Sequence, residues 1–247
     1  MNASANGDTT TLYSPWKLFI SAPIPLAMAK ADARPCSKLL FGRLLMFAGQ
    51  DGACYPTLSR ISESMCWSER KVSRELAHLV RLGVLKRRQL KYNRSAHCSF
   101  VWQDFLAGSL IRPDTGLEVG RPYLPYKRFL SAFVPLPVLQ LEKLASGAKL
   151  LFGVLALHAA DGCHCFPALA QLATEMACSE RTVSRWMDEL VKHGFIRRFR
   201  TDPSCNSTCV FIWNESLRSG LRSDVVVNAF ESPLGEYFGV GTFKSGS

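Results

Sequence analysis

The sequence contains one pattern twice, and this duplication limits the fold more than any other feature. Residues 38–42 (KLLFG) recur as residues 149–153, and SERKVSR at 68–74 recurs as SERTVSR at 179–185. Both pairs of segments are 111 positions apart. A repeating unit of about a hundred residues is too long for a solenoid repeat and has the size of a domain. We therefore expect two copies of one domain, which a chain of 247 residues can accommodate.

The boundaries of the two copies follow from the extent of the similarity. It reaches upstream to Trp16 in the first copy and to Tyr126 in the second. The segment between the copies carries Gly, Pro, Asp and Thr without an apolar period, which is typical of a linker. In chain order we expect a first domain at residues 13–106, a linker at 107–122, a second domain at 123–217 and a flexible tail at 218–247.

The apolar pattern of the second copy predicts three helices followed by a β-hairpin. Residues 150–158 have the i, i+3, i+4 spacing of an amphipathic helix, and a second helix is predicted at 168–176. Ser179 is a helix N-cap residue for the third helix, and Gly194 ends it in the left-handed conformation. The hairpin follows within residues 195–213. This order predicts a mainly α fold with small β-hairpin wings (α+β), namely two tandem winged helix-turn-helix domains.

In this arrangement the third helix enters the major groove of DNA, and its exposed amino-terminal residues meet the base edges. Arginine can fork onto guanine, and small hydroxyl side chains avoid the DNA backbone. Charges on a single helix would be read as a solvated face, but their recurrence favours contact with DNA. The candidates are Ser68, Glu69, Arg70, Lys71, Ser73 and Arg74 in the first copy, and Ser179, Glu180, Arg181, Thr182, Ser184 and Arg185 in the second.

The two recognition helices differ where Lys71 is replaced by Thr182 and where Glu75 is replaced by Trp186. We therefore expect the copies to read different sequences, or only one of them to read bases. As direct repeats on a short linker, they would occupy two major-groove segments about 34–36 Å apart on one face of the DNA.

Basic residues also gather in the predicted wings. The formal net charge is +10 and the pI is about 9.3, which favours a polyanionic partner. Wing residues of this kind contact phosphates and contribute affinity rather than sequence information. The candidates are Lys86, Arg87, Arg88, Lys91 and Arg94 in the first copy, and Arg197, Arg198 and Arg200 in the second.

Nine cysteines raise the question of a metal site or a disulfide framework. The number is odd, and we expect reduced thiols. Cys54 with Cys98 and Cys165 with Cys209 recur in both copies, which predicts buried packing residues on neighbouring strands. A zinc site would draw on Cys163, His164, Cys165, Cys205 and Cys209, but three of these have no counterpart in the first copy. We expect no metal and no cofactor.

Catalytic motifs are missing from the sequence. It holds no phosphate-binding Gly-rich loop, and its five histidines have no partnered nucleophile or carboxylate pair. We therefore expect no catalytic residues and no enzymatic activity. The chain also has no apolar stretch of about 20 residues and no signal-like start, so we expect a cytoplasmic protein without a membrane partner.

The second copy resembles the helix-turn-helix modules of plasmid and phage replication proteins. The resemblance rests on residues 133–137 (FVPLP), 147–152 (GAKLLF), 165–167 (CFP), 179–185 (SERTVSR) and 194–196 (GFI). Two consecutive winged helices are also similar to the tandem arrangement of plasmid replication initiators. The resemblance implies double-stranded DNA binding on a mobile element.

Replication initiation at an origin is the first functional hypothesis. The alternatives are a transcriptional repressor that binds an operator as a pseudo-dimer, and a winged-helix docking subunit of a larger nucleoprotein complex. The expected partners are double-stranded DNA and, in the first and third cases, other proteins of the nucleoprotein complex. We expect a monomer or weak dimer associated with the nucleoid or with a plasmid.

Overall fold

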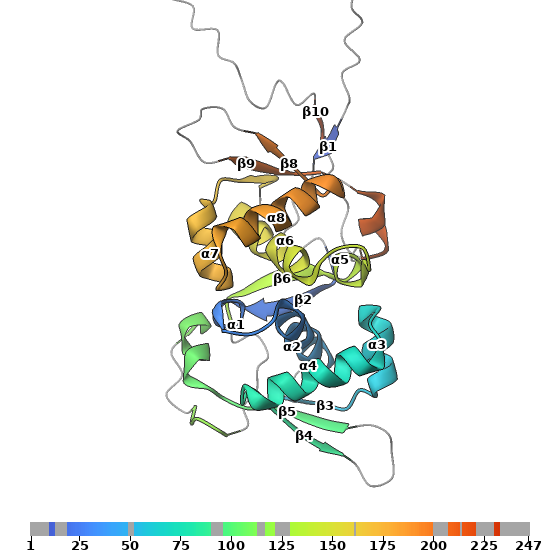
Figure 1. Ribbon diagram of the computed structural model, residues 1–247, viewed down its shortest axis with the longest axis vertical. Helices are drawn as coiled ribbons and strands as arrows, with labels where there is room; N and C mark the ends of the chain where they lie inside the picture. Colours follow the sequence, from blue (N-terminus) through green and yellow to red (C-terminus); the bar gives the residue numbers. More distant parts are fainter. Residues whose placement is uncertain are drawn as a thin grey trace, which may run out of the picture.

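Two copies of a winged helix-turn-helix fold lie one above the other along the long axis of the molecule (Figure 1). The computed structural model describes residues 10–12, 19–48, 52–89, 96–112, 117–121, 129–160, 162–199, 207–212, 214–220 and 230–232. The fold class that the repeat predicts is confirmed, because each copy follows the same order of helices and strands.

The first copy runs through β2 (Ser21–Pro25), α1 (Leu26–Lys30), α2 (Pro35–Ala48), β3 (Ala53–Cys54), α3 (Leu58–Met65), α4 (Glu69–Arg81), β4 (Leu85–Gln89), β5 (Ala96–Phe100) and the 3-10 helix η1 (Asp104–Ser109). The second copy repeats this order as β6 (Ser131–Pro135), α5 (Leu136–Gln140), α6 (Ser146–Ala159), β7 (His164–Cys165), α7 (Leu169–Met176), α8 (Glu180–Lys192), β8 (Ile196–Phe199), β9 (Thr208–Phe211) and η2 (Glu215–Gly220). The helix-turn-helix pairs are α3–α4 and α7–α8.

The ends of the recognition helices α4 and α8 are set by residues that the sequence identifies. The hydroxyls of Ser68 and Ser179 accept a hydrogen bond from the backbone N–H three residues later, which satisfies one free donor of the first turn. Gly83 and Gly194 follow the helices with positive φ, as predicted for Gly194. The third helix of each copy therefore begins and ends where its local sequence places it.

The same aromatic contact anchors the core of each copy. Phe41 of α2 meets the edge of Phe100 with ring centroids 5.5 Å apart, and Phe152 of α6 meets Phe211 at 5.3 Å. The wing sheets have the orders β3-β5-β4 and β7-β9-β8. Such edge-to-face pairs stabilise a core beyond the area that they bury.

The recurring cysteines face each other across these sheets, which confirms their predicted placement on neighbouring strands. Cys54 pairs in register with Cys98, and Cys165 pairs with Cys209. All four are buried free thiols. Hydrogen bonding to the opposite cysteine, together with burial, raises the pKa of Cys54 and of Cys165, so these two thiols remain protonated at neutral pH.

The copies are joined by a two-stranded antiparallel ribbon of β2 and β6. Its register pairs Ser21 with Pro135, Pro23 with Phe133 and Pro25 with Ser131. Pro23 and Phe133 are equivalent positions of the two copies, and the pairs on either side exchange equivalents. The copies are thus related by rotation about the centre of the ribbon, and one buried core runs through both.

Two glycines allow the ribbon to lie close against the helices beneath it. A Cβ atom at Gly42 of α2 would lie 2.7 Å from the carbonyl oxygen of Pro23. At the equivalent Gly153 of α6, it would lie 2.8 Å from Val134 and 3.2 Å from the carbonyl of Phe133. The 2.7 and 2.8 Å distances are shorter than Cβ atoms normally allow, so the glycine of the KLLFG motif lets each helix approach the ribbon closely.

The expected linker and tail differ from the structure in detail. The boundary at residues 106 and 107 falls inside η1, and the backbone of Trp102 bonds to Gly120 and to Arg121 across the linker region. Helix η2 crosses the boundary at 217, and β10 (Phe230–Ser232) pairs with β1 (Thr10–Leu12). Residues 120 and 121 of the expected linker are therefore held against the first copy, because their backbone polar groups find partners there.

Candidate nucleic-acid interface

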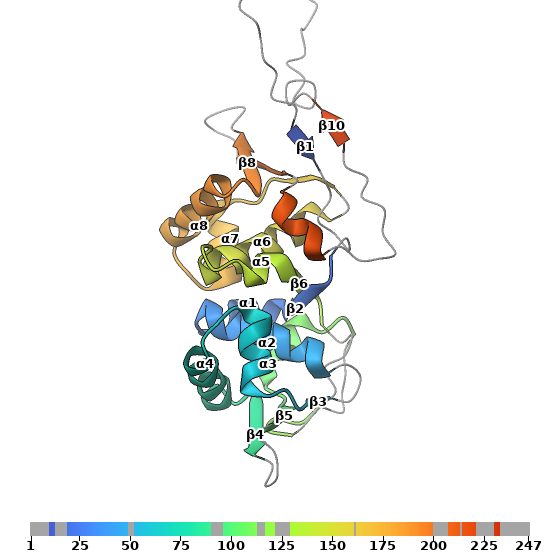
Figure 2. The same ribbon diagram turned by 90° about the vertical axis from the view of Figure 1, so that its right-hand side faces the viewer.

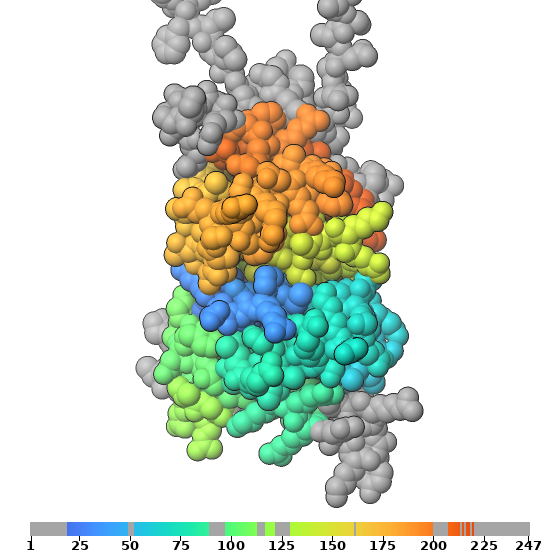
Figure 3. Space-filling model, viewed as in Figure 1, coloured from blue at the N-terminus to red at the C-terminus, as the bar shows by residue number. Residues whose placement is uncertain are grey.

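Both recognition helices lie on one face of the molecule. Figures 1 and 3 show α8 in the upper half and α4 in the lower half of the same view. In Figure 2, turned by 90°, both helices lie on the side opposite the β2–β6 ribbon. A single DNA duplex laid along this face would meet both helices.

The structure places the predicted base-reading residues at the solvent-facing start of each helix. Exposed positions are Glu69, Arg70, Ser73 and Arg74 in α4, and Glu180, Arg181 and Arg185 in α8. Lys71, Thr182 and Ser184 are half-buried. Ser68 and Ser179 are exposed, but their hydroxyls serve as N-caps, which gives them a structural role besides any contact with DNA.

The Glu75 side chain is buried in the protein instead of facing solvent on α4. This corrects the prediction that the difference between Glu75 and Trp186 changes the sequence that each copy reads. Its side chain is 1% exposed. The hydroxyl of Ser37 in α2 donates to Glu75 Oε2 at 2.6 Å, and Arg74 Nε donates to Oε1 at 3.0 Å. Arg34 lies 3.7 Å from the same oxygen. Glu75 therefore anchors α4 on α2 and holds Arg74 in place.

These partners determine the charge of the buried carboxyl. Burial by itself raises the pKa of Glu75, but the hydrogen bonds from Ser37 and Arg74 and the charges of Arg74 and Arg34 outweigh burial, so the pKa is lowered. The carboxylate is ionised at neutral pH, and its pairing with Arg74 fixes part of that side chain while 61% of it remains exposed.

In the second copy the same junction is apolar. Trp186 replaces Glu75 and is 8% exposed, and Ala148 stands where the first copy has Ser37. A Cβ atom at Gly147 would lie only 2.0 Å from the Trp186 ring, so the indole covers this glycine directly. The differences at Glu75/Trp186 and Ser37/Ala148 are thus alternative ways of packing the recognition helix. Arg185, the counterpart of Arg74, makes no ion pair among the described residues.

Lys71 is the remaining predicted difference, and it lies half-buried at the start of α4. Its ammonium lies 4.0 Å from the centre of the Trp67 ring, a cation–π contact in the turn before α4. The second copy has Cys178 and Thr182 at these two positions, and the Thr182 hydroxyl lies 2.9 Å from that of Ser179. Only the first copy presents a long cation here.

The described part of the wings carries exposed or half-exposed cations. Lys86, Arg87 and Arg88 are exposed on β4, although Lys86 Nζ donates to the carbonyl of Gly120 at 3.0 Å. Arg197 and Arg198 are half-buried on β8, and Arg198 lies 3.5 Å from Asp188 of α8. The other predicted wing residues, Lys91, Arg94 and Arg200, lie outside the described residues.

Two buried lysines at equivalent positions were not identified as functional from the sequence. Lys38 and Lys149 are each 2% exposed, and burial lowers the pKa of both to about 8. Lys38 Nζ donates to the carbonyls of Ala29 at 2.6 Å and Met176 at 3.1 Å, and Lys149 Nζ donates to that of Leu139 at 2.7 Å. The sequence does contain a sign of their burial, because the lysine that begins the KLLFG motif recurs in both copies next to an apolar run.

The contact of Lys38 with Met176 crosses from one copy to the other. Met176 is the last residue of α7, where a helix has free carbonyl groups and the negative end of its dipole. A cation from the first copy therefore caps the first helix of the second helix-turn-helix. This polar contact joins the first copy to the helix-turn-helix of the second copy.

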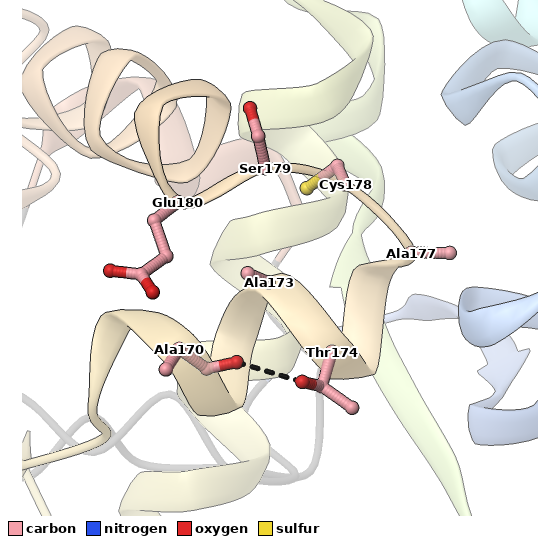
Figure 4. A pocket seen from close by; sticks show the side chains of 7 residues that line it. All are labelled: Ala170, Ala173, Thr174, Ala177, Cys178, Ser179 and Glu180. Atoms are coloured by element: carbon pink, nitrogen blue, oxygen red, sulfur yellow. Dashed lines mark hydrogen bonds between the residues drawn. The ribbon is translucent and has the colours of Figure 1, made fainter.

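An open hollow lies at the turn between α7 and α8 (Figure 4). It is lined mainly by small side chains, and the Thr174 hydroxyl donates to the carbonyl of Ala170 at 2.9 Å. The charged group at its edge is Glu180, whose carboxylate repels an anion. The hollow is therefore unsuited to a phosphate, and we assign no ligand to it.

The described part of the chain shows neither a cluster of metal ligands nor a membrane-spanning helix. Within the described residues, no three His, Cys, Asp or Glu side chains come together as metal ligands. Cys163 Sγ lies 3.8 Å from His164 Nδ1, whereas Cys205 lies outside the described part of the chain. None of the helices in the described ranges has the length and apolar character needed to cross a bilayer.

Comparison with known proteins identifies the three-helix part of each copy. Residues 35–85 and 142–196 each match the sequence profile of a family described as a helix-turn-helix domain. The matched segments contain α2, α3 and α4, and α6, α7 and α8. No curated protein matches the sequence. The chain therefore carries tandem helix-turn-helix domains, a class of domain that suggests DNA binding.

Proposed function

We propose that the chain is a sequence-specific double-stranded DNA-binding protein whose two recognition helices act together in cis. The observation that carries this proposal is the presentation of both helices on one face, with Arg70 and Arg181 exposed at matching positions. Arginine at the start of such a helix can bond to two acceptors of one guanine. The role is one of binding, without a catalytic step or a cofactor.

The experiment is selection of bound duplexes from a random-sequence pool with the purified chain. A consensus site is expected. Two triple variants, one with Arg70, Lys71 and Arg74 changed to alanine and one with Arg181, Thr182 and Arg185 changed to alanine, should each lose part of the sequence preference. If binding drops uniformly while the preference is retained, the helices contact only phosphates, and the docking alternative replaces this proposal.

Within DNA binding, we propose recognition of a replication origin on a plasmid or another mobile element. This part depends on the resemblance of residues 133–137, 147–152 and 179–185 to modules of replication proteins. Control of transcription uses the same geometry and is the alternative. Repeated copies of the selected site beside an origin, and loss of plasmid maintenance in the triple variants, support the first role. A single operator upstream of a gene supports the second.

A further inference from the structure

The joint between the copies has reciprocal hydrogen bonds as well as a symmetric register. The N–H of Leu26 donates to the carbonyl of Leu130 at 3.0 Å, and the N–H of Leu136 donates to that of Ile20 at 2.9 Å. Leu26 and Leu136 are equivalent positions, as are Ile20 and Leu130. Each bond from one copy thus has its counterpart from the other, which is the pattern of a two-fold interface within one chain.

The direction of this pseudo-two-fold axis follows from the order of the layers. In an antiparallel pair the axis runs perpendicular to the face of the ribbon. Helices α2 and α6 pack on the ribbon, and α4 and α8 pack in turn on α2 and α6. Figure 2 shows this order from the ribbon on one side to the recognition helices on the other. The axis therefore leaves the molecule through the face that carries both recognition helices.

The recognition helices begin close to the axis, and the wings lie far from it. Lys38 Nζ of the first copy donates to the carbonyl of Met176, the last residue of α7, four residues before α8 begins. On the other side, Gln140 Nε2 of the second copy donates to the carbonyl of Ser64 at 3.3 Å, near the end of α3 and five residues before α4 begins. The wing strands lie toward the opposite ends of the long axis in Figure 1. Each copy thus presents the start of its recognition helix inside and its wing outside.

We propose that one chain binds a single DNA site made of two inverted half-sites, with base contacts near the centre and wing contacts to the phosphates at both outer ends. The proposal rests on the proposed DNA-binding function. It differs from the arrangement that a direct repeat in the sequence predicts, because two readers related by a two-fold axis meet opposite strands in the same orientation.

The half-sites share most of their sequence, because the exposed starts of the two helices are nearly identical. Equivalent residues agree at Glu69/Glu180, Arg70/Arg181, Ser73/Ser184 and Arg74/Arg185. The pair Glu75/Trp186 is buried and does not itself face the DNA, although Glu75 holds Arg74 in place and Trp186 makes no such pair with Arg185. Lys71 against Thr182 is the difference that remains at the exposed start, so the site departs from a perfect palindrome at the position that this pair reads.

The experiment compares three duplexes built from the consensus that the purified full chain selects from a random 30-base-pair pool. One keeps both half-sites inverted, one reverses a half-site in place to make a direct repeat, and one scrambles a half-site. Binding to the direct repeat should fall at least about tenfold, to the level of the scrambled duplex. A consensus that is a direct repeat or a single half-site overturns this inference but leaves sequence-specific binding intact. Selection without any consensus overturns the DNA-binding proposal itself.

A variant tests the source of the asymmetry. Lys71→Thr makes the exposed starts of both helices alike, and the backbone N–H of residue 71 still bonds to Ser68. Selection with this variant should yield a more symmetric site, changed in one half only. An unchanged consensus would show that Lys71 and Thr182 do not read bases. Circular dichroism of the variant confirms that it is folded, so that a lost preference is not mistaken for unfolding.

Discussion

Replacing Gly147 with alanine should destabilise the protein through one identifiable contact. The new Cβ atom would lie 2.0 Å from Cε2 and Cζ2 of Trp186 and 2.5 Å from Nε1, where side chains keep more than 3 Å. The buried indole must move by about an ångström, or α6 and α8 must separate. Overpacking of this kind costs about 1–3 kcal/mol. Gly147 is the second residue of α6, so the gain in helix propensity is small, about 0.5 kcal/mol.

The net loss should be about 0.5–2.5 kcal/mol, which lowers the melting temperature by about 1–10 °C in a chain of this size. Urea unfolding followed by circular dichroism measures it. Gly108→Ala is the matched control, because no atom lies within 4 Å of the Cβ that this change adds. Trp186→Phe, which introduces a smaller ring, should restore part of the stability of the Gly147→Ala variant. If Gly147→Ala is as stable as Gly108→Ala, the indole does not pack against this glycine and the reasoning fails.

Three further predictions concern the charged residues. Glu75→Gln should cost about 1–3 kcal/mol at pH 7. Because the pKa of Glu75 is lowered in the folded state, the wild-type advantage should start to shrink as the pH falls through the usual carboxyl value of 4.5 and should be lost below the lowered folded-state pKa. A constant difference between the acid unfolding curves would contradict this. The Lys38→Met variant tests the buried ammonium. Between about pH 8, the lowered pKa of Lys38 in the folded protein, and pH 10.5, its ordinary value, the unfolded wild type binds more protons than the folded wild type, so the stability of the wild type relative to the variant should rise with pH. A flat or falling difference in urea unfolding would refute this. Arg70→Ala and Arg181→Ala should each weaken binding to the selected duplex by about 1–3 kcal/mol, as measured by fluorescence anisotropy. Each should also relax the base preference at one of two symmetry-related base pairs. An equal loss of affinity on all sequences would instead indicate phosphate contacts.

The sequence predicted the helices and strands within each copy, but it did not predict how the two copies pack together. Helix ends were predicted because Ser179 and Gly194 act on their own backbone within a few residues. The paired cysteines could be placed because the repeat brings the same two strands together in each copy. The role of Glu75 could not be predicted, because its position on the helix surface allows either a DNA-facing or an inward side chain until the partners Ser37 and Arg34 are known.

By itself, the duplication in the sequence determined that two similar winged helix-turn-helix domains form and which residues begin their recognition helices. It did not determine how the domains are placed relative to each other. A repeat specifies the same contacts within each copy, but it carries no information about the contacts between the copies. Only the tertiary structure decided that β2 pairs with β6 about Pro23 and Phe133. That pairing joins residues about 110 positions apart, and it turns a tandem repeat into a two-fold arrangement with both recognition helices on one face.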